Sequence, residues 1–315
     1  MADVVKKATR EGYGSGLVKL GEKYDDFIVM DADLAAATKS GTFKKAFPER
    51  FYNCGIAEGN MIGIAAGIAA TGKKVFCSSF AMFAAGRAFE QIRNSVGYPH
   101  LNVKICATHA GISVGEDGAT HQCNEDIGIL RTIPGMVIIN PADTVEAEKA
   151  LEAMYNYDGP AYARFGRLAV PIIFDDDYKF EIGKAVELRE GTDVTIIATG
   201  LMVAEALVAY DILKAEGINA RIINMATIKP LDKEAVIKAA KETGAIVTAE
   251  EHSIIGGLGS AVLEALSEEC PVPVVRVGVN DEFGMSGPAN DLLDKFGLRG
   301  KDIAEKAKKA MALKK

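Results

Sequence analysis

The sequence predicts an α/β protein built from two doubly wound domains with mostly parallel sheets. Short runs of apolar and β-branched residues alternate along the chain with segments of helical periodicity. Strands alternating with helices of this length are typical of parallel sheets that carry helices on both faces. The chain also has 315 residues, more than one compact core usually holds, and a polar stretch divides it into two periodic parts.

The first part contains four expected strands, each short and apolar. They lie at residues 27–30, 74–79, 102–108 and 136–140. Helical periodicity is present at residues 58–71, 84–96, 125–132 and 144–155. Pro141-Ala142-Asp143 marks the turn into the last of these helices. The order of these elements predicts that residues 1–175 form one domain.

The second part repeats the alternation in a smaller unit. Strands are expected at residues 194–198, 220–225, 245–249 and 274–279. Helices are expected at residues 201–216, at 232–243 and from about 257, and two further helices close the chain. A polar stretch that begins with Asp175-Asp176-Asp177 separates the two parts. We therefore place a linker at residues 176–190 and a second domain at residues 191–315.

Composition limits the classes of function. The net charge of −7 argues against a nucleic-acid partner, because phosphate neutralisation needs an excess of Lys and Arg. The sequence shows neither an apolar run of membrane-spanning length nor the apolar centre of a signal peptide. Its five cysteines form no CxxC motif, which favours a reducing compartment. We therefore expect a cytoplasmic protein without a membrane partner.

The densest polar segment runs from residue 53 to 126 and holds His100, His109 and His121, three of the four histidines. The last two lie in a glycine-rich loop that follows the expected strand 102–108, and such loops carry most α/β sites. The loop has three possible interpretations. It is a structural turn, a pocket for hydroxyls and phosphate, or a metal centre with His109, Asp117 and His121 as ligands.

The helix expected from Glu58 carries glycines at every fourth position, Gly59, Gly63 and Gly67, which places them on one face. Each costs about 1 kcal/mol relative to alanine, so close approach of another element is expected to compensate. That element lies either in the domain's own core or in another subunit.

Glu58 itself is open to two interpretations. A carboxylate in the first turn of a helix gains a favourable interaction with the helix dipole. Its apolar sequence neighbours suggest instead a functional carboxyl with a raised pKa. Phe80 and Phe83 follow the expected strand 74–79, where ligands of open α/β sheets bind. They are core residues or a platform for a flat heteroaromatic ring.

Four motifs in this order resemble the transketolases. They are IAEGNM at 56–61, SFAMF at 79–83, RAFEQIR at 87–93 and GEDG at 115–118. The resemblance is to the pyrimidine-binding and C-terminal domains of that family and covers essentially the whole chain. It implies an enzyme of carbohydrate metabolism, in the pentose phosphate pathway. Such an enzyme uses thiamine diphosphate to move a two-carbon ketol unit from a ketose phosphate to an aldose phosphate.

The same resemblance implies roles for individual residues. Glu58 matches the catalytic glutamate that hydrogen-bonds the aminopyrimidine ring of the coenzyme. Phe80 and Phe83 match the aromatic residues that stack on this ring, and Asp33 matches an acidic residue near the coenzyme. The residues implied for substrate are the catalytic histidines His109 and His121, with Asp117 for a sugar hydroxyl and Arg10 and Arg167 for the phosphate.

Two departures from the family pattern matter. A serine that contacts phosphate in the family falls on Ala37, so the identity of the sugar stays open. The sequence also lacks the Gly-Asp-Gly motif and the downstream asparagine that hold Mg²⁺ and the diphosphate. We therefore expect the C-terminal subunit of a split transketolase. The metal ligands would lie on a separate N-terminal subunit, and the assembly would be an α2β2 heterotetramer around a dimeric core.

Three alternatives stay open. One is a β-type subunit of another thiamine diphosphate enzyme, either a 2-oxo acid dehydrogenase or a deoxyxylulose phosphate synthase fragment. Another is a metal-dependent hydrolase that uses His109, Asp117 and His121. The last is a non-catalytic scaffold or regulatory subunit, in which Glu58 would be dispensable.

Overall fold

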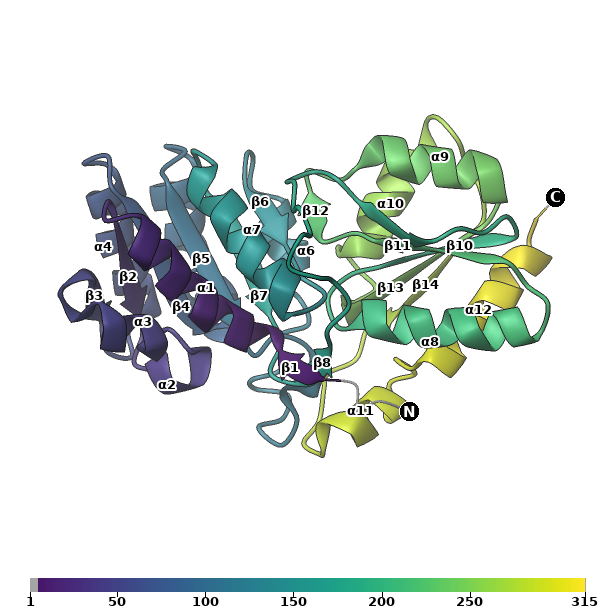
Figure 1. Ribbon diagram of the computed structural model, residues 1–315, viewed down its shortest axis with the longest axis horizontal. Coiled ribbons are helices and arrows are strands. Elements are labelled where there is room, and N and C mark those ends of the chain that lie inside the picture. Colours follow the sequence, from purple (N-terminus) through teal and green to yellow (C-terminus); the bar gives the residue numbers. More distant parts are fainter. Residues whose placement is uncertain (1–4, 315) are drawn as a thin grey trace.

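The computed structural model describes residues 5–314 and contains two α/β domains side by side (Figure 1). The first is built on a seven-stranded sheet in which every pairing is parallel except that of β12 with β6. Its spatial order is β12 (Thr227–Lys229), β6 (Val137–Ile139), β7 (Ala161–Phe165), β5 (Val103–Thr108), β4 (Lys74–Phe80), β2 (Phe27–Asp31) and β3 (Phe51–Asn53).

Helices cover both faces of this sheet (Figure 1). One face carries α1 (Thr9–Lys23), α3 (Gly41–Ala46) and α7 (Thr144–Asn156), whose apolar side chains share a core with the strands. The opposite face carries α4 (Glu58–Ala69), a helical segment at 82–97 and α6 (Asp126–Arg131). Two short turns, α2 (Ala35–Thr38) and η1 (Pro48–Arg50), lie between β2 and β3.

The helix predicted at 84–96 is not a regular α-helix. It begins at Met82 and contains two π-helical segments, η2 (Met82–Arg87) and η3 (Ile92–Gly97), on either side of the short α5 (Phe89–Gln91). A π-helical turn holds more residues than an α-helical one and occurs often at functional sites. The wide turns therefore set the directions of the side chains that follow Phe80.

The second domain has five strands in the order β14 (Val274–Val279), β13 (Ile246–Ser253), β10 (Val194–Ala198), β11 (Ala220–Asn224) and β9 (Val186–Arg189). Only β9 is antiparallel to its neighbour. The helices α8 (Met202–Ala215) and α12 (Gly300–Ala312) pack on one face. The other face carries α9 (Lys233–Thr243) and α10 (Leu258–Ser267), and α11 (Ala289–Lys295) packs against the first domain.

The fold class agrees with the sequence prediction, and every predicted strand and helix is present, the one at 84–96 in the π-helical form described above. The prediction did not include the helices α1, α2 and α3 or the strands β3, β7, β9 and β12. Two further strands, β1 (Lys6–Ala8) and β8 (Ala169–Pro171), pair with each other beside the first domain. The strand β12 comes from the second half of the chain yet completes the first sheet, pairing Thr227 with Ile139. A strand from the second half of the chain therefore forms one edge of the first domain's sheet.

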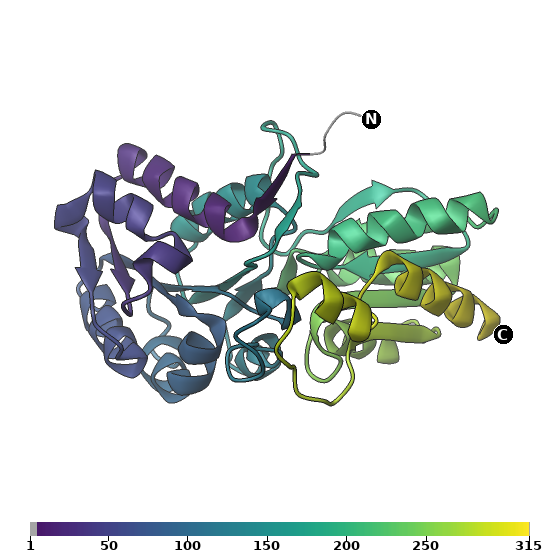
Figure 2. The same ribbon diagram turned by 90° about the horizontal axis from the view of Figure 1, so that it is seen from below.

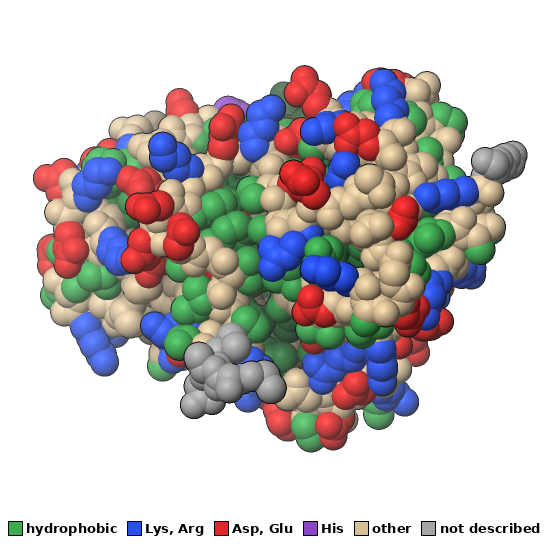
Figure 3. All heavy atoms as spheres, turned by 45° about the vertical axis from the view of Figure 1, so that its right-hand side comes forward, with side chains coloured by type: hydrophobic (Ala, Val, Ile, Leu, Met, Phe, Trp, Pro, Cys, Tyr) green, Lys and Arg blue, Asp and Glu red, His purple; other side chains and the backbone are tan. Residues whose placement is uncertain are grey.

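The hydrophobic core also joins the two domains. One hydrophobic core runs from the α4 face of the first domain into the second, where it includes Val236 and Leu258. Figure 3 shows acidic and basic side chains intermixed around a hollowed band of apolar side chains. Among residues 5–314, no helix is long and apolar enough to cross a membrane.

Candidate functional site

The parallel strands of the first sheet bring most of the candidate residues to one edge. Since β2, β4, β5 and β7 run in the same direction, their carboxyl ends meet there. Phe80 ends β4 and His109 follows β5, and Arg167 comes shortly after β7. His100 precedes β5 and packs against Tyr157 at the opposite edge, so it does not join the other histidines.

Four aromatic rings form a wall at this edge. Phe80 stacks on His109 with ring centroids 3.8 Å apart, and on Phe83 at 6.1 Å with an interplanar angle of 18°. His121 meets Phe83 edge-on at 5.2 Å. Phe80 and Phe83 therefore lie together, and the two histidines join them. Stacked and edge-on rings of this kind suit a flat heteroaromatic ligand.

Glu58 begins α4 and is only 1% exposed. Its two carboxylate oxygens accept hydrogen bonds of 3.2 and 3.0 Å from Nη1 of Arg87, at the end of the π-helical segment η2. The Arg87 guanidinium also lies 4.5 Å from the centre of the Phe83 ring. The sequence neighbours suggested an apolar setting for this carboxyl, and that picture was incomplete. Glu58 is paired with a cation, while the neighbouring Ile56 is 78% exposed.

His109 is held as a neutral imidazole. The Arg10 guanidinium can only donate, so His109 Nε2 accepts its 3.0 Å hydrogen bond and Nδ1–H donates to Thr108 Oγ1 at 2.8 Å. Burial, followed by the charge of Arg10 and then that of Arg167, lowers the pKa of His109 to about 3. This ring therefore carries no charge at neutral pH.

Arg10 and Arg167 converge on the same region. Arg10 Nη1 donates a 2.9 Å bond to the backbone carbonyl of Ala37, and burial and the nearby Arg167 lower the pKa of Arg10. Arg167 Nη1 donates to the carbonyl of Val114 and, at 3.2 Å, to Oε2 of Glu116. Two guanidinium groups this close repel each other, which an anion between them would relieve. At the position where the family has serine, Ala37 contributes its main chain.

The remaining predicted residues lie at the border of the site. Asp33 and Asp117 are exposed, and Asp33 pairs with Asn53, whose amide Nδ2 donates a 2.8 Å bond to its carboxylate. His121 is partly buried and shares a 2.9 Å bond between its Nδ1 and Thr120 Oγ1. Both carboxylates therefore face solvent, where a partner chain or ligand can reach them.

Sequence reasoning missed two supporting residues. One is Arg87, which was noted only as part of a motif. The other is Asp31, whose buried carboxylate accepts 2.8 Å bonds from the hydroxyls of Thr38 and Ser40. Burial raises the pKa of Asp31. The only signal for it was an acid at the carboxyl end of a predicted strand. It holds the turn that presents the Ala37 carbonyl to Arg10.

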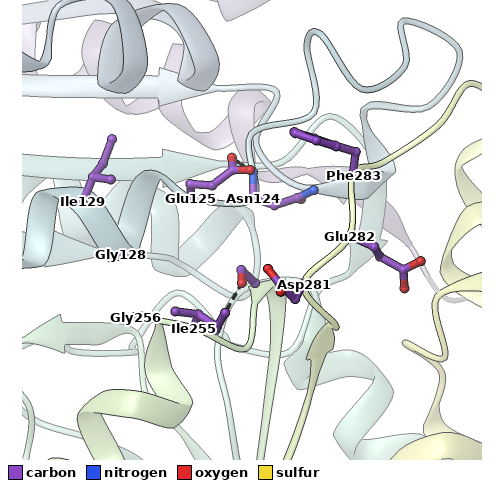
Figure 4. Close-up of a pocket in the computed structure, with 10 residues that line it drawn as sticks. Asn124, Glu125, Gly128, Ile129, Ile255, Gly256, Asp281, Glu282 and Phe283 are labelled. Carbon is purple, nitrogen blue, oxygen red and sulfur yellow. Dashed lines mark hydrogen bonds between the residues drawn. The ribbon is translucent and has the colours of Figure 1, made fainter.

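A cavity of about 450 Å³ lies next to this edge, at the junction of the two domains. Figure 4 shows Asn124 and Glu125 of the first domain on one side and Asp281, Glu282 and Phe283 of the second on the other. None of the predicted site residues lines it. Asn124 and Glu125, which line it, follow shortly after the loop that carries His121, so the second domain faces the end of that loop across the cavity.

The structure does not group the metal ligands that one interpretation of the histidine loop requires. Within residues 5–314, no three His, Cys, Asp or Glu side chains are grouped closely enough to hold a metal ion. The Nε2 atom of His109 faces Arg10 instead. The side chains at this edge fit an aromatic ring and an anion better. The aromatic wall and the buried Glu58 suit an aminopyrimidine, and the two arginines suit a phosphate group.

Comparison with known proteins agrees with this fold. Residues 5–172 match the pyrimidine-binding domain of transketolase, and residues 183–303 match the transketolase C-terminal domain. The chain therefore belongs to the transketolase family. Within that family it corresponds to the C-terminal section of a split transketolase, as the relatives below indicate.

A protein of Methanocaldococcus jannaschii described as a putative transketolase C-terminal section is 53% identical, over 98% of this chain and 97% of its own length. A 6-deoxy-6-sulfo-D-fructose transketolase subunit from Clostridium is 46% identical, over 95% of this chain and 92% of its own. Human transketolase is 40% identical, and the match covers 95% of this chain but 48% of the human protein.

The solved structures include one described as a split gene transketolase in an inactive β4 tetramer. It superposes on this chain with a TM-score of 0.90 at 52% identity, covering 98% of this chain and 99% of the other. The family, the two-domain fold and the relation to split subunits are thus confirmed.

Proposed function

We propose that this chain is the C-terminal subunit of a transketolase that depends on thiamine diphosphate. With a separate N-terminal subunit, it would transfer a two-carbon ketol unit from a ketose phosphate to an aldose phosphate. The observation that carries the proposal is the buried Glu58 carboxylate beside the Phe80–Phe83 wall, at the same sheet edge as Arg10 and Arg167. A ring-binding half and an anion-binding half lie next to each other.

The coenzyme half of the site is assigned to Glu58, Phe80 and Phe83. When bound, thiamine diphosphate would supply an electron sink for the two-carbon unit. Phe80 and Phe83 would hold the pyrimidine ring by stacking, and Glu58 would exchange a proton with its ring nitrogen. Arg87 is 54% exposed, so it can move away from the Glu58 carboxylate when a ring takes that place. Asp33 would lie near the coenzyme.

The substrate half is assigned to His109, His121, Asp117, Arg10 and Arg167. The neutral imidazole of His109 has an unprotonated Nε2 at neutral pH, which can accept a hydrogen bond from a substrate hydroxyl in place of Arg10. His121 would act beside it, and Asp117 would bind a sugar hydroxyl. Arg10 and Arg167 would bind the phosphate, and the buried Nε of Arg10 has no partner among the described residues. Such a donor suits an anionic ligand.

The partner is assigned to the exposed face of α4. Gly63 and Gly67 are exposed, and an added Cβ at either would meet nothing within 4 Å. Gly63 and Gly67 therefore do not pack into the domain's own core, whereas Gly59 lies against the Gln91 side chain. Ile64 on the same helix is 41% exposed, and Ile56 just before it is 78% exposed. Apolar side chains around bare backbone support close approach of another subunit.

The remaining parts of the proposal follow the family. The N-terminal subunit would supply the ligands of Mg²⁺ and of the diphosphate, in an α2β2 assembly. The enzyme would be cytoplasmic and would act in the pentose phosphate pathway. The domain limits at residues 175 and 191 stay part of this proposal.

A second candidate substrate is a sugar that ends in a sulfonate. The relative from Clostridium is named for 6-deoxy-6-sulfo-D-fructose, and another, from Phocaeicola vulgatus, is 42% identical and named for apulose 4-phosphate. Arg10 and Arg167 can bind either anion, and Ala37 has no hydroxyl to favour phosphate.

The proposed function is tested by isolating the native complex and assaying it with and without thiamine diphosphate and Mg²⁺. We expect ketol transfer from a ketose phosphate or sulfo-sugar that depends on the coenzyme, and no turnover of pyruvate. Turnover of pyruvate without ketol transfer would instead identify a different thiamine diphosphate enzyme. Activity that does not depend on the coenzyme would contradict the proposal.

A further inference from the structure

We propose that the second domain positions the loop at residues 109–122, here called the substrate loop, and that Glu251 is the main positioning residue. This inference rests on the proposed function, because it gives the second domain a role in binding the anionic end of the sugar. It assigns no chemical step to that domain. Two segments of the second domain contact this loop, β13 and residues 281–287.

The first contact is made by β13. Glu251 is 3% exposed, and its Oε1 accepts a 2.5 Å hydrogen bond from the backbone N–H of Ser113 in η4 (Ile112–Val114). Gly111 lies against the same carboxylate, since a Cβ there would come within 2.5 Å of it, and its φ of +81° favours glycine. A buried carboxylate bound to a backbone N–H fixes that N–H more strongly than a neutral acceptor would.

Arg164 connects Glu251 to the residues that follow the substrate loop. Its Nη2 donates to the carbonyl of Glu251 at 2.8 Å and to the carbonyl of Cys123 at 3.1 Å, just beyond the substrate loop. Its Nε pairs with the buried Asp126 at 2.9 Å. The start of the loop and the residues that follow it are thus fixed to the same strand of the second domain.

The second contact is made by residues 281–287. Gln122 is 2% exposed, and its Nε2 donates to the carbonyls of Met285 at 2.9 Å, Gly115 at 3.1 Å and Ile112 at 3.2 Å. An added Cβ at Gly284 would overlap the Gln122 carboxamide. Figure 2 shows this segment and α11, in yellow, at the junction of the two domains. The substrate loop is therefore held by the second domain at its end as well as at η4.

The part of the substrate loop that the second domain holds also contacts Arg167, one of the two arginines assigned to the phosphate. The last residue of η4, Val114, accepts a hydrogen bond from Arg167 through its carbonyl, and Arg167 also pairs with Glu116 on the substrate loop. Glu251 fixes the N–H of Ser113, which is one residue before that carbonyl. If the N–H is released, the carbonyl and the guanidinium that depends on it should shift together. Loss of Glu251 should therefore weaken binding of the phosphate and leave the coenzyme half unchanged.

The test uses the complex of both subunits, with either Glu251→Ala or Glu251→Gln in this chain. Saturation is measured with glyceraldehyde 3-phosphate and with unphosphorylated glyceraldehyde as acceptors. Loss of a hydrogen bond to a buried charge should raise the KM for the phosphorylated acceptor by about 10-fold. The KM for the unphosphorylated acceptor and kcat should stay within about twofold, and Glu251→Gln should be intermediate. The matched control is Glu264→Gln, an exposed glutamate of the same domain that pairs with Arg131.

A second variant tests the inference independently, because Glu251→Ala leaves a gap in a buried contact. Gly284→Ala forces a methyl group against Gln122, and it should raise the same KM, whereas Gly287→Ala on the same segment meets only the flexible Leu292 side chain. Hydrogen exchange of residues 110–122 in this chain gives a readout that needs no activity, and it should be faster in Glu251→Ala and in Gly284→Ala.

The outcomes separate this inference from the proposed function. A wild-type complex without ketol transfer contradicts the proposed function, and the exchange rates still decide whether Glu251 holds the loop. An active wild type with unchanged KM values and exchange in both variants overturns the inference. Equal losses with both acceptors also overturn it, since they indicate a general structural role.

Discussion

Arg87 donates hydrogen bonds to both carboxylate oxygens of Glu58, and Glu58 is 1% exposed while the arginine side chain is 54% exposed. One partner is thus buried at the start of α4, and the other is free to leave. The pair holds a carboxylate in place next to the aromatic wall, and an aminopyrimidine ring that binds there would compete with Arg87 for it.

Replacing Glu58 with Gln should remove turnover while the chain still assembles. The amide has the same shape but cannot exchange a proton with the coenzyme ring, so we expect kcat to fall by ~100-fold or more. Steady-state assays of the native complex measure this loss. The matched control is Glu90→Gln on the neighbouring helix, because Glu90 contacts only Gln91 and Asn94 and should keep normal turnover. Normal turnover in Glu58→Gln would support the scaffold alternative.

Replacing Arg87 with Ala should destabilise the isolated chain, because it leaves the buried carboxylate of Glu58 unpaired. Discounting for the exposure of Arg87, we expect the free energy of unfolding to fall by about 1–2 kcal/mol, measured by urea denaturation. In the double variant Glu58→Gln with Arg87→Ala, the second change should cost less than it does alone. Additive effects would show that the ion pair contributes nothing.

Stability should fall in acid because of buried histidines. Burial lowers the pKa of His109 to about 3 and that of His252 to about 4, below the usual value near 6.5. Between these values the unfolded chain binds more protons, so each histidine destabilises the fold as pH falls from about 6.5 toward its folded pKa. The effect is at most about 1.4 kcal/mol per pH unit for each group.

Two buried glutamates act in the opposite direction. Burial raises the pKa of Glu146 and of Glu250 to about 7, so they contribute stability below about pH 4.5 that is lost as pH rises through 7.

Because His109 acts only on the acid side, His109→Asn should flatten the acid side of the stability curve without changing its neutral side. Urea denaturation between pH 3 and 8 measures both slopes. An unchanged acid slope in His109→Asn would contradict a neutral His109.

A leucine at Gly63 should separate folding from assembly. An added Cβ there meets nothing within 4 Å, and leucine favours helix by about 0.8 kcal/mol over glycine, so the isolated chain should be slightly more stable. Association with the N-terminal subunit should weaken strongly, because the new side chain blocks close approach. Sedimentation of the mixed subunits measures this. Asp211→Leu on the exposed side of α8 is the control, and a destabilised Gly63→Leu chain with normal assembly would contradict the interface.

The sequence was sufficient to predict the alternation of strands and helices and the residues at the carboxyl ends of β4 and β5. Those follow from local periodicity and from the rule that parallel strands end at one edge. It could not predict that Arg87 reaches Glu58, because their contact depends on a π-helical turn and joins residues 29 positions apart in the sequence. The pairing of β12 with β6 and the contact of Glu251 with Ser113 were equally out of reach. Such contacts depend on how distant segments pack.

The most direct test of the central claim is titration of the purified chain with its N-terminal subunit, in the presence of thiamine diphosphate and Mg²⁺. If the chain provides half of a shared coenzyme site, ketol transfer should be absent from either subunit alone. It should then rise with added partner and level off at equal amounts of the two chains. Full ketol transfer by this chain alone, without any partner, would contradict the account.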